Sequence, residues 1–216
     1  MRSPVGARRA LWIACGALAR ELAALRRLAG WQHVEITCLP PELHQRPEQI
    51  PARVRALLEA TAGRYDEVFV AYADCGTGGG LDAVLDEYGA ERLPGAHCYE
   101  VFAGSAGFEA LQQAEPGTFY LTDFLVRHFE RLVIRSLGLD RHPELRSAYF
   151  GHYRRVVYLR QSPSPELEAA ARRCAERLGL AYEIRWTGLA GLDRALRRAR
   201  TRQDPAEATR ASGTMP

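Results

Sequence analysis

The sequence predicts an α/β fold: a mainly parallel sheet of about seven strands with helices on both faces, Rossmann-like or flavodoxin-like. The first observation is that short apolar runs alternate with stretches of helical periodicity along nearly the whole chain, as in strands joined by crossover helices. The second is that the runs "VFVAY" (68–72) and "VVYL" (156–159) are apolar at every position, which is typical of strands buried on both faces. With 216 residues, 47% of them hydrophobic, the chain can form one such domain or two lobes.

Four strands, each followed by a helix, are expected in the first half of the chain. Their predicted ranges are 11–15 with 17–29, 33–39 with 48–62, 66–72 with 80–88, and 97–102 with 105–114. The strands are assigned from short apolar runs, and the helices from apolar residues that recur every three or four positions. Pro47 and Pro51 suit the first turn of the second helix, where a missing N–H does no harm.

Three further strands are expected in the second half. Their predicted ranges are 117–123 with 124–136 and 143–151, 154–160 with 165–178, and 181–186 with 190–199. Asp123 at the end of the first of them is expected to cap the helix that follows.

The predicted domain organisation is a single α/β domain over 9–200, with a boundary between two lobes near residue 115, where "QQAEPGTF" joins them. Residues 1–8 are expected to form a flexible tail. Residues 201–216 are polar and small and are expected to form a disordered tail.

Composition excludes several classes of function. All 29 basic residues are arginine, so neither a Schiff-base lysine for pyridoxal phosphate nor the lysine of a P-loop nucleotide site exists. A net charge of +3, spread along the chain, does not indicate a nucleic-acid partner. No segment reaches the ~18–20 apolar residues of a membrane helix, so no membrane partner is expected. The apolar run after the N-terminal arginines is interpreted as a first strand, Leu11–Cys15, rather than as part of a signal peptide, and a cytoplasmic protein is expected.

Cysteines recur at corresponding places in the predicted strands. Cys15, Cys38 and Cys75 end the first three strands, and Cys98 lies in the fourth beside His97. Because the carboxyl ends of parallel strands meet at one edge of a sheet, where ligands bind, we expect these thiols to share that edge. Five cysteines, an odd number, favour metal binding or catalysis over a disulfide framework.

The leading hypothesis is therefore a Cys/His metal site that binds zinc, with iron as the second choice, since thiolate and imidazole suit such ions. The expected ligands are Cys15, Cys75 and Cys98, with His97 or Cys38 as the fourth. Asp74 and Glu100 are expected to orient a histidine or to activate a bound water.

Two other hypotheses start from the glycine turn "DCGTGGG" (74–80). In one, Cys75 is a metal-free nucleophile acting on an acyl or amide substrate, with His97, His44, His128 or His152 as its base. In the other, the protein is a non-catalytic module that binds a small anion or a partner protein. The expected ligand-contacting residues are Gly76, Thr77, Gly78 and Gly79, with His44 and Arg46 from the neighbouring loop. An enzyme acting on a small-molecule substrate, a transferase or a hydrolase, is favoured over the module.

Six phrases of the sequence are also characteristic of a family. They are "IACGALARE", "VEITCLPPELHQRPEQIP", "VAYADCGTGGGLDAVL", "PGAHCYEVFAG", "GTFYLTDFL" and "YFGHYRRVVYL". Over about residues 10–190, the chain resembles the bacterial and archaeal domain-of-unknown-function family numbered 1638. Members of that family are often encoded near corrinoid-dependent methyltransferases, so the resemblance implies corrinoid or methyltransferase proteins as partners and a role in one-carbon or methyl-transfer metabolism.

Overall fold

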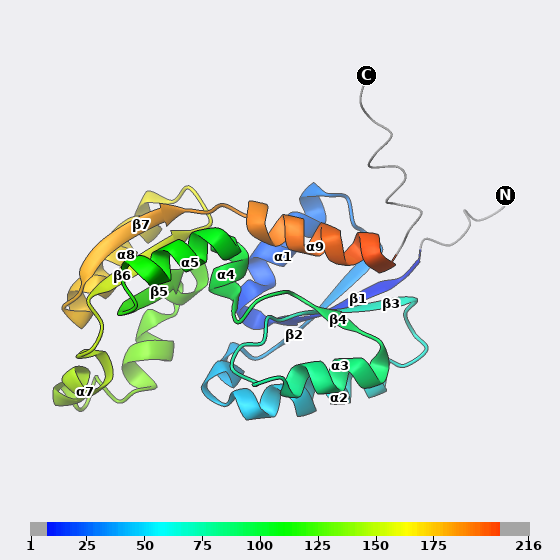
Figure 1. Ribbon diagram of the computed structural model, residues 1–216, viewed down its shortest axis with the longest axis horizontal. Coiled ribbons are helices and arrows are strands. Elements are labelled where there is room, and N and C mark those ends of the chain that lie inside the picture. Colours follow the sequence, from blue (N-terminus) through cyan, green and yellow to red (C-terminus); the bar gives the residue numbers. More distant parts are fainter. Residues whose placement is uncertain (1–7, 204–216) are drawn as a thin grey trace, which may run out of the picture. The chain divides into compact units, whose positions relative to one another are not determined.

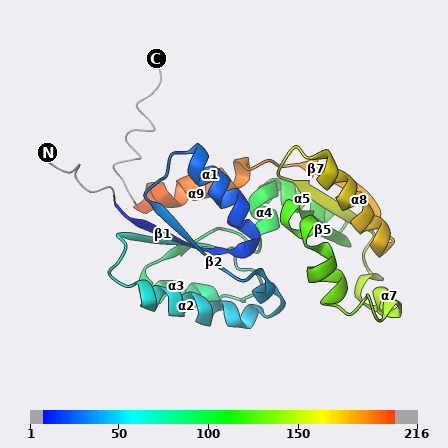
Figure 2. The ribbon, with the colours of Figure 1, turned by 180° about the vertical axis from the view of Figure 1, so that it is seen from behind.

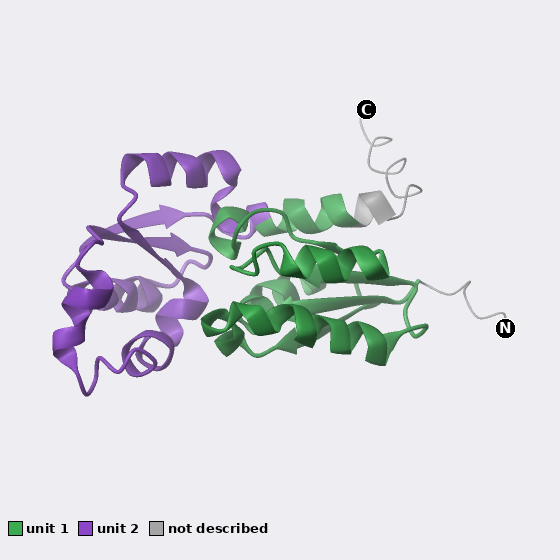
Figure 3. Cartoon of the chain, turned by 60° about the horizontal axis from the view of Figure 1, so that its bottom comes forward, with its two compact units in different colours: residues 1–101, 192–216 green, residues 102–191 purple. Residues whose placement is uncertain are grey.

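The computed structural model describes residues 8–203. Within that range the chain forms two compact units, which Figure 3 shows in different colours. Unit 1 comprises residues up to Val101 and from Leu192 onward, and unit 2 comprises Phe102–Gly191. The sequence placed a boundary near residue 115, whereas the contacts divide the chain inside two helices, α4 (Cys98–Ala103) and α9 (Ala190–Gln203).

The predicted tails fall mostly beyond the described part of the chain. Residues 1–7 and 204–216 lie outside the described residues. Residues 201–203, which were assigned to the second tail, continue helix α9.

Unit 1 contains a four-stranded parallel sheet with the strand order β2-β1-β3-β4. Its strands are β1 (Ala10–Cys15), β2 (Val34–Leu39), β3 (Glu67–Ala71) and β4 (Glu91–Arg92). Ala14 of β1 pairs with Cys38 of β2 and with Ala71 of β3. The carboxyl ends of these three strands therefore lie level with one another.

Helices cover both faces of this sheet (Figures 1 and 2). Helices α1 (Ala19–Leu28) and α9 lie on one face, and α2 (Ile50–Thr61) and α3 (Gly80–Tyr88) lie on the other. Helix α2 buries Ile50, Val54 and Leu58, which recur every four residues and so form one apolar stripe. Short 3-10 helices η1 (Gly16–Leu18), η2 (Pro41–Gln45) and η3 (Pro47–Gln49) connect the strands to α1 and α2.

Unit 2 contains a separate three-stranded parallel sheet in the order β5-β6-β7. Its strands are β5 (Thr118–Thr122), β6 (Arg155–Arg160) and β7 (Ala181–Trp186). Its helices are α5 (Ser105–Ala114), α6 (Asp123–Arg127), the π-helix η4 (Glu130–Arg135), η5 (Pro143–Leu145), α7 (Arg146–Phe150) and α8 (Pro165–Leu178).

One face of the unit 2 sheet packs on η4 and α8, where Tyr158 of β6 joins Val133 and Ala175 in one core. The other face meets α5, because the rings of Phe108 and Tyr120 lie 5.2 Å apart. The unit therefore has helices on both faces of its small sheet.

The fold class is confirmed at the level of parallel α/β structure, but the prediction of seven strands in one sheet is wrong. Four strands belong to one sheet and three to another. The predicted strand 97–102 is mostly helix α4, and β4 is instead a two-residue strand at Glu91–Arg92. The Glu100 carboxylate accepts the N–H of Ala96 (3.0 Å) just before α4, so this acid satisfies a free donor at the helix start.

The helix predicted over 124–136 is also interrupted. Helix α6 ends at Arg127, and η4 then continues with π-helical geometry. Thr122, rather than Asp123, caps α6, since its hydroxyl accepts the N–H of Leu125 (3.3 Å).

Among residues 8–203, no helix is both long and apolar enough to cross a membrane.

Candidate functional site

The carboxyl edge of the unit 1 sheet brings together the cysteines that the sequence singles out. The chain runs from β1 to β2 on one side and later places β3 on the other side of β1, so the order of strands reverses between β1 and β3. Ligands of open α/β sheets bind outside the carboxyl ends at such a point. Cys15 is the last residue of β1, Cys75 follows β3, and Cys98 begins α4.

The glycine turn after β3 is closed by its own aspartate. The Asp74 carboxylate accepts the hydroxyl of Thr77 (2.7 Å) and the N–H groups of Gly76 (3.2 Å), Gly78 (3.2 Å) and Gly79 (3.1 Å). The Thr77 hydroxyl and then these N–H groups hold the pKa of Asp74 below its usual value. The backbone N–H groups that were expected to bind a small anion therefore donate to Asp74 instead.

A second loop, the one that follows β4, is fixed against the glycine turn. The N–H of Cys75 donates to the carbonyl of Ala96 (2.7 Å). The guanidinium of Arg92 donates to the carbonyl of Gly95 (3.2 Å) and pairs with both carboxylate oxygens of Asp82 (2.6 and 2.9 Å). The start of α4 is therefore held beside Cys75.

Cys75 has a strained backbone. It has a φ of 53°, and no other residue except glycine has a positive φ in the described range. The left-handed region costs an L-residue about 1–2 kcal/mol, and such strain persists only where its surroundings impose it. Here the bond to Ala96 and the Asp74-bound turn impose it on either side of Cys75.

This strain gives a direct prediction. Cys75→Gly is expected to be more stable than Cys75→Ala by about 1 kcal/mol, because only glycine adopts this backbone without a steric cost. Urea unfolding of the two variants measures the difference. An alanine variant equal to or more stable than the glycine variant would show that the backbone relaxes at Cys75 without strain.

The thiols of this edge are neutral at physiological pH. Burial is the largest cause for each of them, raising the pKa of Cys15 to about 12 and that of Cys75 to about 11. Burial, and next the neighbouring Cys75 and Cys15, raise the pKa of Cys98 far above its usual value. Hydrogen bonds from the backbone of Ala73 and Cys98 lower the pKa of Cys75 without overcoming burial.

Tyr72 and His44 complete the surroundings of Cys15. Tyr72 is fully buried and its hydroxyl has no partner with hydrogen-bond geometry in the described chain, although the hydroxyl is near enough to Cys15 for the two groups to affect each other's pKa. The ring of His44 stacks on Tyr72 with centroids 6.2 Å apart. Its Nδ1 lies 3.1 Å from the carbonyl of Pro41 and 3.7 Å from Cys15 Sγ. Because a carbonyl only accepts, this contact assigns the hydrogen to Nδ1, which then cannot take a proton from the thiol.

The prediction of a zinc or iron site is wrong. Within residues 8–203, no group of three or more His, Cys, Asp or Glu side chains is placed to hold a metal ion. A tetrahedral site needs its donor atoms about 2.0–2.3 Å from one point. The two carboxylates expected to support it, Asp74 and Glu100, instead accept backbone N–H groups of their own loops.

The other predicted residues have different surroundings. Cys38 is exposed on β2 and lines a groove with Arg26 and Glu35, and Arg46 is exposed in the loop before α2. The ring of His97 lies 5.3 Å from that of Tyr99. His128 and His152, considered as bases for Cys75, belong to unit 2.

Two residues of the site were missed. Tyr72 continues the apolar run of β3 and was assigned only to the strand, although a hydroxyl at a strand end is a polar group at the binding edge. Arg92 lies in a stretch without clear periodicity. Its signal was the nearby Asp82, an acid with which an arginine can form a bidentate pair.

The fold and this edge define an α/β protein with two parallel sheets and a group of buried and half-buried thiols at the switch point of the larger one. The chain matches the model of the family described as "Protein of unknown function (DUF1638)" over residues 38–196, so it belongs to that family. The match confirms the resemblance, and Cys15 lies before its first residue. No curated protein and no solved structure matches the chain.

Proposed function

We propose that unit 1 is a cysteine-dependent enzyme acting on a small molecule with an activated acyl group, and that Cys75 is its nucleophile. The observation that supports this is the left-handed backbone of Cys75, held on a strand-to-helix turn at the switch point. Strained nucleophile turns of this kind expose a side chain at the top of a sheet. The order β2-β1-β3-β4 agrees with a flavodoxin-like unit, whose ligands bind at the β1/β3 switch point.

The chemistry must begin from a neutral thiol. With a pKa of about 11, Cys75 carries its proton until substrate is bound, so sulfur attack on the carbonyl carbon has to be coupled to transfer of that proton to the departing group. The Tyr72 hydroxyl, which lies beside Cys15, is the side chain we propose to donate a hydrogen bond to the substrate. The glycine turn and Arg92 act as positioning elements.

Acylation of the protein tests this function. The Cys38→Ser variant, which lacks the exposed thiol of β2, would be incubated with phenyl thioacetate and analysed by intact mass and peptide mapping. We expect a single acetyl group on Cys75, absent when Cys75→Ala is added to the same background. Acetylation at an unchanged rate in the double variant, or none on Cys75, would contradict the proposal.

Ligand binding without chemistry is the second candidate, favoured by the raised pKa values of the buried thiols. It predicts no acetyl adduct on Cys75 in the same experiment. It also predicts that alkylation of Cys75 by iodoacetamide accelerates with pH up to about pH 11, as for a thiol without an activating base.

A further inference from the structure

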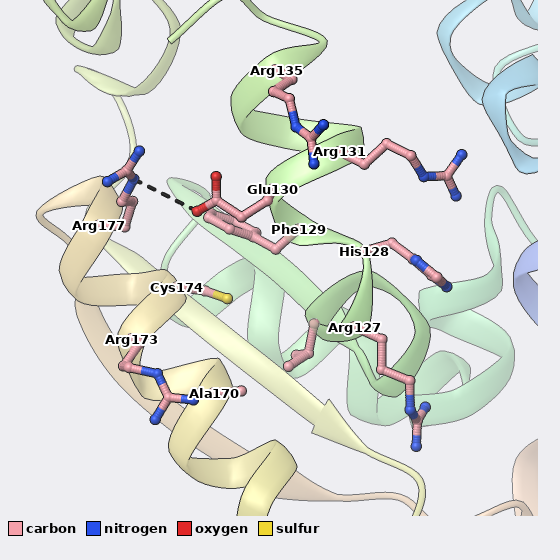
Figure 4. A pocket seen from close by; sticks show the side chains of 11 residues that line it. Arg127, His128, Phe129, Glu130, Arg131, Arg135, Ala170, Arg173, Cys174 and Arg177 are labelled. Atoms are coloured by element: carbon pink, nitrogen blue, oxygen red, sulfur yellow. Dashed lines mark ion pairs between the residues drawn. The ribbon is translucent and has the colours of Figure 1, made fainter. Parts of the chain in front are cut away.

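A cationic groove lies between α6, η4 and α8 in unit 2 (Figure 4). Its volume is about 580 Å³. Buried Val126, Phe129 and Cys174 contribute to its lining, together with Ala170. Its charged and titratable residues are Arg127, Arg131, Arg135, Arg173, Arg177, His128 and Glu130. We call this feature the arginine groove.

Arginines outnumber acids in the lining of the arginine groove. Among the described residues that line it, five are arginine and Glu130 is the one acid, whose carboxylate lies 3.9 Å from Arg177. Arg127 lies 3.9 Å from the buried Asp123. Arg135 and Arg173 are exposed and form no ion pair with any residue in the described range. Concentrated like charge destabilises the folded chain by self-repulsion, so an anionic partner would stabilise this surface.

The arrangement of the guanidinium groups indicates an extended partner. In Figure 4 the side chains of Arg127, Arg135 and Arg173 spread to different sides of the groove and do not converge on one point. A single phosphate or carboxylate could contact only one or two of them, whereas a chain with several separated negative charges could contact more. The π-helical turn Glu130–Arg135 that carries part of this surface is a geometry found frequently at functional sites.

We propose that the arginine groove binds an acidic segment of a partner protein. Guanidinium groups pair with carboxylates through two parallel hydrogen bonds, and the apolar lining around Phe129 and Ala170 accepts an apolar side chain between two acids. A nucleic acid is the weaker match, because Glu130 lies among the arginines and would repel a uniform row of phosphates.

Fluorescence anisotropy of labelled peptides tests this proposal. The probe is a fluorescein-labelled peptide of glutamate pairs separated by single leucines, and its control has glutamine in place of every glutamate. We expect the glutamate peptide to bind the wild-type chain at least about tenfold more tightly than the glutamine peptide, with a Kd that rises with salt. Equal affinities for the two peptides would overturn the proposal without any variant.

The site of binding is tested by charge reversal. The double variant Arg135→Glu/Arg173→Glu is expected to raise the Kd for the glutamate peptide at least about tenfold, whereas Arg141→Glu, an exposed arginine outside the groove, is expected to leave it within about twofold. Equal effects of the two changes would overturn the assignment to this groove. A labelled single-stranded oligonucleotide that binds more tightly than the peptide, and is lost only in the double variant, would show that the occupant is a nucleic acid instead.

Discussion

Replacing Asp123 by alanine is expected to lower the free energy of unfolding by about 3–5 kcal/mol. Asp123 is 1% exposed at the start of α6. Its carboxylate accepts the hydroxyl of Tyr158 (2.6 Å), the N–H of Gln161 (3.1 Å) and the hydroxyl of Ser162, and it therefore joins the ends of β5 and β6. Without the carboxylate, the buried donors of Tyr158 and Gln161 lose their acceptor, and each buried unsatisfied group costs about 1–3 kcal/mol.

Urea unfolding followed by far-UV circular dichroism measures this loss. The matched control is Asp140→Ala, which removes the same charge from an exposed position of unit 2 and is expected to change the free energy by no more than about 0.5 kcal/mol. A loss below about 1 kcal/mol for Asp123→Ala would show that the network rearranges or admits water.

The sequence located six of the seven strands of the described residues, but not the sheets that they form. Strands such as Ala10–Cys15 and Arg155–Arg160 contain continuous apolar runs of four residues or more, and that signal is local. Which strands pair is a property of the whole chain. Here β5, β6 and β7 pair with one another and not with β4, and the chain divides inside α4, which follows β4.

The error at 97–102 had a local cause as well. The phrase "HCYEVF" is short and contains tyrosine, valine and phenylalanine, residue types that are enriched in strands. Glu100 was the contrary signal, since an acid a few residues after a turn satisfies the free N–H groups at a helix start, as it does for Ala96. Glu100 was expected to have a catalytic role, but its position in the sequence also fits the first turn of a helix.

The candidate site was predictable to the level of topology. The rule that strand ends meet at one edge placed Cys15 and Cys75 at the switch point, where the structure has them. The rule does not predict the directions of the side chains. Three or four thiols at one edge form a metal site only if their sulfur atoms point to one centre. It also could not show that Asp74 occupies the N–H groups of its own turn, because that depends on the backbone conformation of the whole turn.

The second large effect is expected at high pH, where the buried thiols make the protein less stable. The pKa of Cys15 is raised by burial from 9.0 to about 12, and that of Cys75 to about 11. A raised folded-state pKa contributes stability below the unfolded pKa, and this stability is lost as pH rises through the folded pKa. Between pH 9 and 11 the unfolded chain therefore releases thiol protons that the folded chain retains. Cys15 alone should account for a loss of roughly 2–3 kcal/mol by pH 11.

This chain is well suited to the measurement because it has no lysine, and all 29 of its basic residues are arginine, which stays protonated. Between pH 9 and 11, the side chains that ionise are then cysteine and tyrosine alone. Urea unfolding at successive pH values, in the presence of a reductant, would be compared for the wild-type chain and Cys15→Ala. Both contain the same tyrosines, so the difference between their slopes isolates Cys15. We expect the slope of the variant to be shallower, and equal slopes would mean that the Cys15 thiol ionises in the folded protein as readily as in the unfolded chain.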